Sequence, residues 1–237
     1  MTCIQGFVCA VPTANRAAFI AHASMAAEAF REHGCARAVE CWGDDVPEGE
    51  ATSFRKAVLA GPDEAIVFSW YVWPSRAAHD AVMQAPPEDS RLTAEGNPMP
   101  FDGKRVIFGA FEPVLELGAP QPGGFFDAFI APVPKNAREK FVAFAMACDP
   151  IFMEHGAVWI MECLGSDLPE GKLTDFRRAV QAEPEEDVLF SIVQWSDRNA
   201  RDAGNGKIMT DLRLAEHTMP FDGRRLIFGG FVPVVER

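Results

Sequence analysis

The sequence is poor in basic residues and contains no long apolar run. Its 237 residues include 22 lysines and arginines against 34 aspartates and glutamates, which gives a formal net charge of -12. An acidic protein repels the phosphate backbone of nucleic acids, and no basic stripe with interleaved aromatic residues is present, so we expect no nucleic-acid binding. No apolar stretch approaches the roughly 20 residues of a membrane span, and the N-terminus lacks the features of an export signal. These absences predict a cytoplasmic protein that does not bind membranes.

The cysteines and histidines show no spacing that would hold a metal. Six cysteines occur without a Cys-x-x-Cys pair, and the five histidines are scattered along the chain. In a chain expected in the cytoplasm, such cysteines are usually free and buried as small apolar side chains. We therefore predict no disulfide framework, no metal site and no bound cofactor.

What the sequence does contain is an internal repeat. Residues 99–111, Met-Pro-Phe-Asp-Gly-Lys-Arg-Val-Ile-Phe-Gly-Ala-Phe, return as residues 219–231, Met-Pro-Phe-Asp-Gly-Arg-Arg-Leu-Ile-Phe-Gly-Gly-Phe. The two copies stay aligned at a spacing of 122 residues up to Leu92 and Leu214, after which the spacing is 120. The repeat predicts a first domain at 1–117, a linker rich in glycine and proline at 118–124, and a second domain at 125–237.

Each copy has the pattern strand, helix, strand, strand, helix, strand. The expected strands lie at 4–11, 36–42, 65–73 and 104–111 in the first copy and at 126–133, 158–164, 188–195 and 224–231 in the second. A long helix is expected at 15–33, and its partner carries the apolar stripe Phe141, Ala145, Cys148 and Phe152. The second helix of the first copy is expected to be interrupted at Ala85-Pro86-Pro87. This order of elements is ferredoxin-like.

The expected strands are apolar on both faces. Two helices cover only one face of a four-stranded sheet, so the other face of each sheet needs a second cover, and the nearest cover is the other copy. We therefore predict an α+β fold in which two ferredoxin-like βαββαβ repeats form an intramolecular version of a dimeric α+β barrel. This internal pseudo-dimer leaves further homodimerisation open.

Two glutamates are the candidate acid–base groups. Glu40 and Glu162 occupy equivalent places on an otherwise apolar strand face, where a carboxylate needs a partner or has a raised pKa. One interpretation is a structural ion pair with Arg105 and Arg225, or with the basic residue that precedes each arginine. The other is that the glutamates line a pocket and act as general bases, with the two arginines as their catalytic charge partners.

A loop of twelve residues keeps its pattern in both copies, at 43–54 and 165–176. Such a loop is longer than a plain connection between elements, and we expect it to be ordered and to cover a site. Its shared carboxylates, Asp45 and Asp167, are candidate binding residues at the rim of a site. Because ordinary solvated turn residues would follow the same pattern, that interpretation stays open.

Two histidines are also matched between the copies. His33 and His155 each precede a glycine at the expected end of the long helix. A histidine in a last turn interacts favourably with the helix dipole, and it is also able to serve as a ligand or a base. We keep both histidines as candidate binding residues.

Several motifs of the chain are similar to those of a known family. They are Glu32-His33-Gly34, Glu40-Cys41-x-Gly43-Asp44-Asp45-Val46-Pro47-x-Gly49, Thr52-Ser53-Phe54, Phe68-Ser69-Trp70 and Met99-Pro-Phe-Asp-Gly-Lys-Arg. With them the chain resembles the YbaA-like bacterial family of unknown function (DUF1428), over nearly the whole of each half. Members are usually a single unit of the dimeric α+β barrel class, so the resemblance implies a fused homodimer. The second copy departs from the pattern at Ser166, Leu168, Asp175 and Ile192, which would weaken one site if the family uses those positions.

The resemblance implies no activity, and more than one function remains open. Families of similar fold perform cofactor-independent oxygenation, isomerisation or haem chemistry, although haem is disfavoured here because no histidine recurs on an inward-facing stripe. The first hypothesis is a cofactor-independent enzyme that acts on a small molecule in the barrel cavity. The alternative is a non-catalytic module that binds a small molecule or a protein, and a purely structural role is a third.

Overall fold

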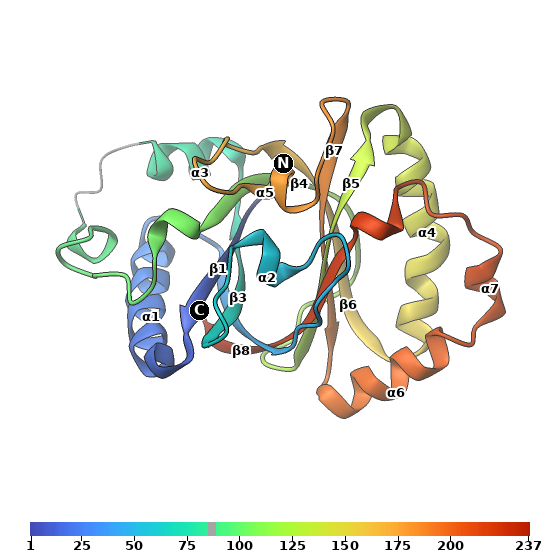
Figure 1. Cartoon of the computed structure of the whole chain (residues 1–237), viewed down its shortest axis with the longest axis horizontal. Coiled ribbons are helices and arrows are strands. Elements are labelled where there is room, and N and C mark those ends of the chain that lie inside the picture. Colours follow the sequence, from blue (N-terminus) through green and yellow to red (C-terminus); the bar gives the residue numbers. More distant parts are fainter. Residues whose placement is uncertain (85–88) are drawn as a thin grey trace.

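The computed structural model describes residues 1–84 and 89–237, and these residues form a closed barrel with two long helices on its outer side (Figure 1). The first half contains β1 (Cys3–Pro12), α1 (Arg16–Glu32), β2 (Arg37–Asp45), α2 (Phe54–Ala57), β3 (Glu64–Trp73), α3 (Arg76–Met83) and β4 (Ile107–Gly118). The second half contains β5 (Phe125–Pro134), α4 (Arg138–Glu154), β6 (Ala157–Asp167), α5 (Phe176–Ala179), β7 (Glu186–Trp195), α6 (Arg198–Ile208), α7 (Leu212–Ala215) and β8 (Ile227–Glu236). The predicted interruption at Ala85-Pro86-Pro87 lies outside the described residues.

The barrel closes through strands of different halves. Its strand order is β1-β3-β2-β8-β5-β7-β6-β4, so that β2 pairs with β8 and β4 pairs with β6, both antiparallel. The long helices α1 and α4 lie on opposite outer sides of the barrel (Figure 1). The predicted α+β fold of two ferredoxin-like repeats, closed into an intramolecular barrel, is therefore confirmed.

Aromatic side chains from both halves fill the inside of the barrel. Phe68 of β3 stacks on Phe190 of β7 with their ring centroids 4.7 Å apart and an interplanar angle of 16°. Phe111 lies 4.7 Å from Phe190, and Phe231 lies 5.4 Å from Phe68. All four rings are fully buried. This shared core explains why the strands are apolar on both faces, since one face meets the helices and the other meets the opposite half.

The last strand of each half begins later than the sequence pattern predicts. Residues Gly103–Arg105 and Gly223–Arg225 each form a short 3-10 turn, and the strands start at Ile107 and Ile227. In the first turn the side chain of Asp102 accepts a hydrogen bond from the Lys104 amide at 3.0 Å. The Asp102 carboxylate therefore stabilises the 3-10 turn instead of strand pairing, and the two basic residues of the turn lie outside the sheet.

The described helices are also too short or too polar for a bilayer, since none of them combines the length and the apolar character that a membrane span requires.

Candidate functional site

The predicted pairing of the buried glutamates with arginine is wrong. Arg105 forms a two-pronged ion pair with Glu64, with Nη2 2.7 Å from Oε1, and Arg225 forms the same pair with Glu186 at 2.7 Å. Each arginine belongs to a 3-10 turn beyond the end of its strand, so its side chain reaches the start of β3 or β7 rather than the middle of the sheet. Arg105 and Arg225 thus hold turns to strands, and the structure does not bring them together with Glu40 or Glu162.

The two loop aspartates pair with arginines of the opposite half. Asp45 Oδ2 lies 2.8 Å from Arg201 Nη1 of α6, and Asp167 Oδ2 lies 2.6 Å from Arg76 Nη2 of α3. Both pairs are partly exposed, where an ion pair contributes little to stability on its own. The geometry places these aspartates at the junction of the halves.

The matched histidines lie at helix ends, as the sequence predicts. His33 and His155 are the C-cap residues of α1 and α4. Their Nε2 atoms lie 3.3 Å from Asp89 Oδ2 and 2.8 Å from Asp211 Oδ2, respectively. Each contact connects the end of the long helix to the segment that follows the second helix of the same half.

In the first half, Glu40 is buried with both carboxylate oxygens occupied. Ser69 donates its hydroxyl to Oε2, and the Tyr71 hydroxyl donates to Oε1 at 2.6 Å. The Tyr71 ring is packed edge-on against Phe7 and Phe30, with a centroid distance of 5.2 Å to each. Burial raises the pKa of Glu40 to about 6 although these two hydrogen bonds act in the opposite direction. The side chain of Tyr71 therefore fills the space beside Glu40.

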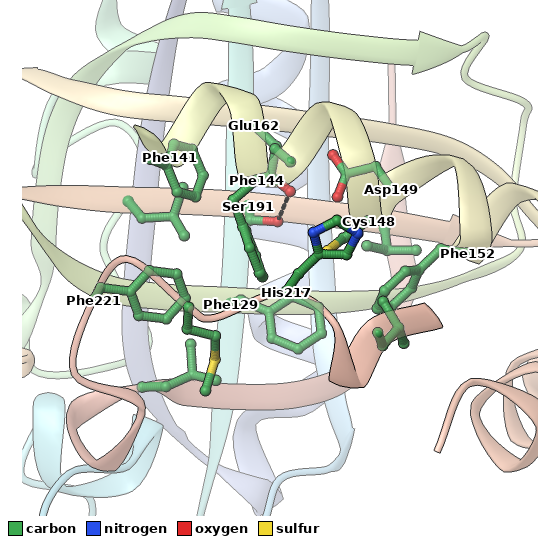
Figure 2. A pocket seen from close by; sticks show the side chains of 16 residues that line it. Phe129, Phe141, Phe144, Cys148, Asp149, Phe152, Glu162, Ser191, His217 and Phe221 are labelled. Atoms are coloured by element: carbon green, nitrogen blue, oxygen red, sulfur yellow. Dashed lines mark hydrogen bonds between the residues drawn. The ribbon is translucent and has the colours of Figure 1, made fainter. Parts of the chain in front are cut away.

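In the second half, a pocket of about 340 Å³ lies beside Glu162, between α4 and the outer face of the sheet (Figure 2). Its walls are mainly aromatic, and the phenylalanines that line it are Phe129, Phe141, Phe144, Phe152 and Phe221. Its polar side chains are few and come from four segments. They are Glu162 of β6, Ser191 of β7, Cys148 and Asp149 of α4, and His217 after α7.

Glu162 and Asp149 are the chemically unusual groups of this pocket. Ser191 donates its hydroxyl to Glu162 Oε1 at 2.7 Å. Within residues 1–84 and 89–237, neither Glu162 Oε2 nor Asp149 Oδ2 has a hydrogen-bond partner, and both atoms are buried. Figure 2 shows the Asp149 carboxylate pointing from α4 toward Glu162, with the His217 ring close by. The pocket thus holds two facing carboxyl groups in apolar surroundings.

Both carboxyl groups have raised pKa values. Burial raises the pKa of Asp149 above its usual 3.8, and burial together with the nearby negative charge of Asp149 raises the pKa of Glu162 above its usual 4.5. Two like charges in one dry site are costly, so the first proton to leave makes the second harder to remove. Near neutral pH the pair therefore retains a proton, with one group able to accept a proton and the other able to donate one.

Comparison with known proteins accounts for both halves of the chain. Residues 2–103 and 124–223 each match the sequence profile of the family described as "Protein of unknown function (DUF1428)". The chain belongs to this family. YbaA of Escherichia coli K12, described as uncharacterised, is 46% identical to this chain over 114 residues, which are 47% of this chain and 97% of YbaA. The length of YbaA corresponds to one DUF1428 unit, and the chain contains two.

Solved structures share the fold at low sequence identity. A proposed monooxygenase from Fusobacterium nucleatum aligns with a TM-score of 0.63 at 10% identity, over 100% of this chain and 94% of the other. An anthrone oxidase-like protein aligns with a TM-score of 0.61 at 9% identity, over 100% and 92% of the two chains. These similarities show that the tandem DUF1428 chain shares its overall fold with both proteins.

Several pocket residues differ between the second DUF1428 unit and the first, and two of these replacements change the space and the charge beside Glu162. Val193 stands where the first unit has Tyr71, since both residues pair with equivalent positions of the neighbouring strands. Asp149 stands where the first unit has the buried Ala27. The smaller side chain opens the pocket, and the carboxylate supplies its second acid. Sequence reasoning missed Asp149, although its spacing from Ala145 and Phe152 places it on the predicted buried stripe of the helix.

The raised pKa values predict that Asp149→Asn stabilises this protein in a pH-dependent way. Below the unfolded-state pKa both carboxyl groups are neutral in the folded and the unfolded protein, so Asp149→Asn changes the free energy of unfolding little. As pH rises, the unfolded chain ionises first while the folded state resists, and the wild type loses stability. We expect a gain of about 1–3 kcal/mol at pH 8 and nearly none at pH 4.

Urea unfolding at both pH values measures this difference. Glu139→Gln is the matched control, because Glu139 is an exposed carboxylate in the first turn of the same helix. A gain of equal size at pH 4 and pH 8 would show that the Asp149 carboxyl is not held in a raised-pKa state.

Proposed function

We propose that the second DUF1428 unit is an acid–base enzyme that moves a proton on a small, mainly apolar molecule bound in the pocket beside Glu162. The observation that carries the proposal is the pair of buried carboxyl groups, Glu162 and Asp149, each with an oxygen that lacks a partner among the described residues. Buried carboxyls with raised pKa values cost stability, and such groups cluster at catalytic sites.

A shared proton supports a simple reaction, the interconversion of a ketone and its enol. The ionised Asp149 takes a proton from the carbon next to the carbonyl group, and the neutral Glu162 gives its proton to the carbonyl oxygen. The C–H bond of the ketone and the O–H bond of Glu162 break, while the O–H bond of Asp149 and the O–H bond of the enol form, so the carboxyl pair still holds one proton. This assignment agrees with the direction in which Asp149 raises the pKa of Glu162.

The walls of the pocket favour a flat, apolar substrate. A volume of about 340 Å³ falls within the usual range of small-molecule sites. Five phenylalanines present ring edges and faces to the ligand, and such apolar surroundings favour the neutral form of the proposed acid. A ring ketone also agrees with the name of the anthrone oxidase-like fold neighbour, which supports the proposal only through shared fold.

Exchange of hydrogen for deuterium tests the proposed chemistry. Ring ketones of one to three rings, with 2-tetralone as the central probe, are incubated with the protein in deuterated buffer, and loss of the signal of the hydrogen next to the carbonyl is followed by NMR. We expect exchange at least about 10²-fold faster than with acetate at the same concentration and pH. Ketones that bind without faster exchange would leave the unit as a non-catalytic binding module.

A further inference from the structure

We propose that the molecule recognised by this pocket carries a hydroxyl group on an aromatic ring, so that its substrate class is a phenol or naphthol and the corresponding ring ketone. The inference rests on the proposed function for the choice of site. It comes from the first half of the same chain, which contains the equivalent site with a hydroxyaromatic ring already in it.

That ring is the side chain of Tyr71, which is buried beside Glu40. It lies between Phe7 and Phe30, at centroid distances of 5.2 Å, and interplanar angles of 62° and 63° make both contacts edge-on. Its hydroxyl donates to Glu40 Oε1 at 2.6 Å. A phenol held edge-on by two phenylalanines and bonded to a buried glutamate is therefore a stable arrangement in this fold.

The second half keeps the surroundings of that ring and removes the ring itself. The residues at the positions of Phe7, Phe30, Glu40 and Tyr71 are Phe129, Phe152, Glu162 and Val193. Three of them still have the same side chain, and all four line the pocket. The pocket thus includes the space that a tyrosine ring occupies in the first half.

The hydrogen bonds of the two glutamates show which group the ligand must supply. Glu40 accepts one hydrogen bond from the hydroxyl of Ser69 and one from the hydroxyl of Tyr71. Glu162 accepts a hydrogen bond from the hydroxyl of Ser191, whereas its second oxygen has no hydrogen-bond donor among residues 1–84 and 89–237. The missing donor corresponds to the tyrosine hydroxyl. When the shared proton lies on Asp149, Glu162 is ionised, and its buried oxygen without a donor favours a ligand that restores one.

The size of the pocket indicates more than one ring. A cavity of about 150 Å³ holds benzene, and this pocket of about 340 Å³ has room for two fused rings. A hydroxyaromatic compound is also the enol form of a ring ketone, so the hydroxyl at Glu162 and the ring carbon near Asp149 are the two ends of the proposed proton transfer. The proposed acid therefore acts at oxygen and the proposed base at carbon.

Calorimetric titration of the whole chain with 2-naphthol tests the inference, with 2-methoxynaphthalene as a probe of similar shape that has no hydroxyl hydrogen. We expect one 2-naphthol per chain and an affinity at least about tenfold higher than that of the methoxy compound. Val193→Tyr, which restores the ring found in the first half, should abolish binding. Equal affinities for the two probes, or unchanged binding by folded Val193→Tyr, would overturn the inference.

The first half offers the converse experiment. Tyr71→Ala opens space beside Glu40, and phenol, which replaces the lost ring, should then bind as a second molecule per chain. If this variant does not fold, the two probes on the wild-type chain still decide the question. Rapid exchange of 2-tetralone without preference for 2-naphthol would refute the inference and leave the proposed function standing. Tight 2-naphthol binding without any ketone exchange would support the hydroxyaromatic ligand and refute the proposed acid–base function.

Discussion

Replacing Phe190 by alanine is expected to lower the free energy of unfolding by about 3–5 kcal/mol, because a large buried ring is lost and the surroundings cannot fully collapse into its space. Phe190 is fully buried at the centre of the barrel. It contacts Phe68 of the first half, Phe111 and Phe176 at centroid distances of 4.7, 4.7 and 6.0 Å. It therefore joins the two halves as well as filling one of them.

Urea denaturation followed by circular dichroism measures this loss, and Phe228→Ala is the matched control. Phe228 is a phenylalanine on β8 of the same half with 48% of its surface exposed, so its removal should cost less than about 1 kcal/mol. Similar losses for the two variants would mean that the interior of the barrel is not the shared core of the halves.

The second large effect is expected at the proposed catalytic pair. Asp149→Asn and Glu162→Gln should each lower the rate of ketone exchange by about 10²–10⁴-fold, the usual contribution of a positioned acid or base. Each replacement is close in shape to the original side chain, so the pocket keeps its walls. The double variant should lose little more than either single variant, because the two groups act as a unit.

The dependence of the rate on pH separates the two roles. In the wild type the rate should fall on the acidic side when Asp149 is protonated and on the basic side when Glu162 is ionised. The apparent pKa of each limb should lie above the usual carboxyl pKa values of 3.8 and 4.5, because burial raises the pKa of both groups. The residual activity of Asp149→Asn should lack the acidic limb. An unchanged profile in this variant would assign the base to another group.

Glu139→Gln serves again as the control for these rates. This carboxylate is exposed on α4 and does not line the pocket. Its loss should leave the exchange rate and its pH profile within about twofold of the wild type, since a screened surface charge has little effect on a buried site. A large effect here would point to the charge of the helix rather than to the facing carboxyl groups.

Particular elements show how far the sequence leads. The return of Met-Pro-Phe-Asp-Gly at 120 residues revealed the duplication, and strands that are apolar on both faces led to the closed barrel. The stacked pair of Phe68 and Phe190 confirms that interpretation. The burial of Glu40 and Glu162 followed from their alternation along a strand. Arg105 was misplaced because a capped 3-10 turn and the start of a strand look alike in a run of basic and β-branched residues.

The sequence alone determined the architecture. The apolar periodicity of each segment and the duplication are visible in the order of the residues, and each apolar face must be buried against another element. Only the tertiary structure decided that the pocket belongs to the second half. That outcome depends on Val193 of β7, Asp149 of α4 and Glu162 of β6 meeting at one place, although they are separated along the chain. Whether a carboxylate is paired, and whether a space is filled by a ring such as that of Tyr71, depends on which distant side chains pack together, and the pattern of a single segment does not contain that information.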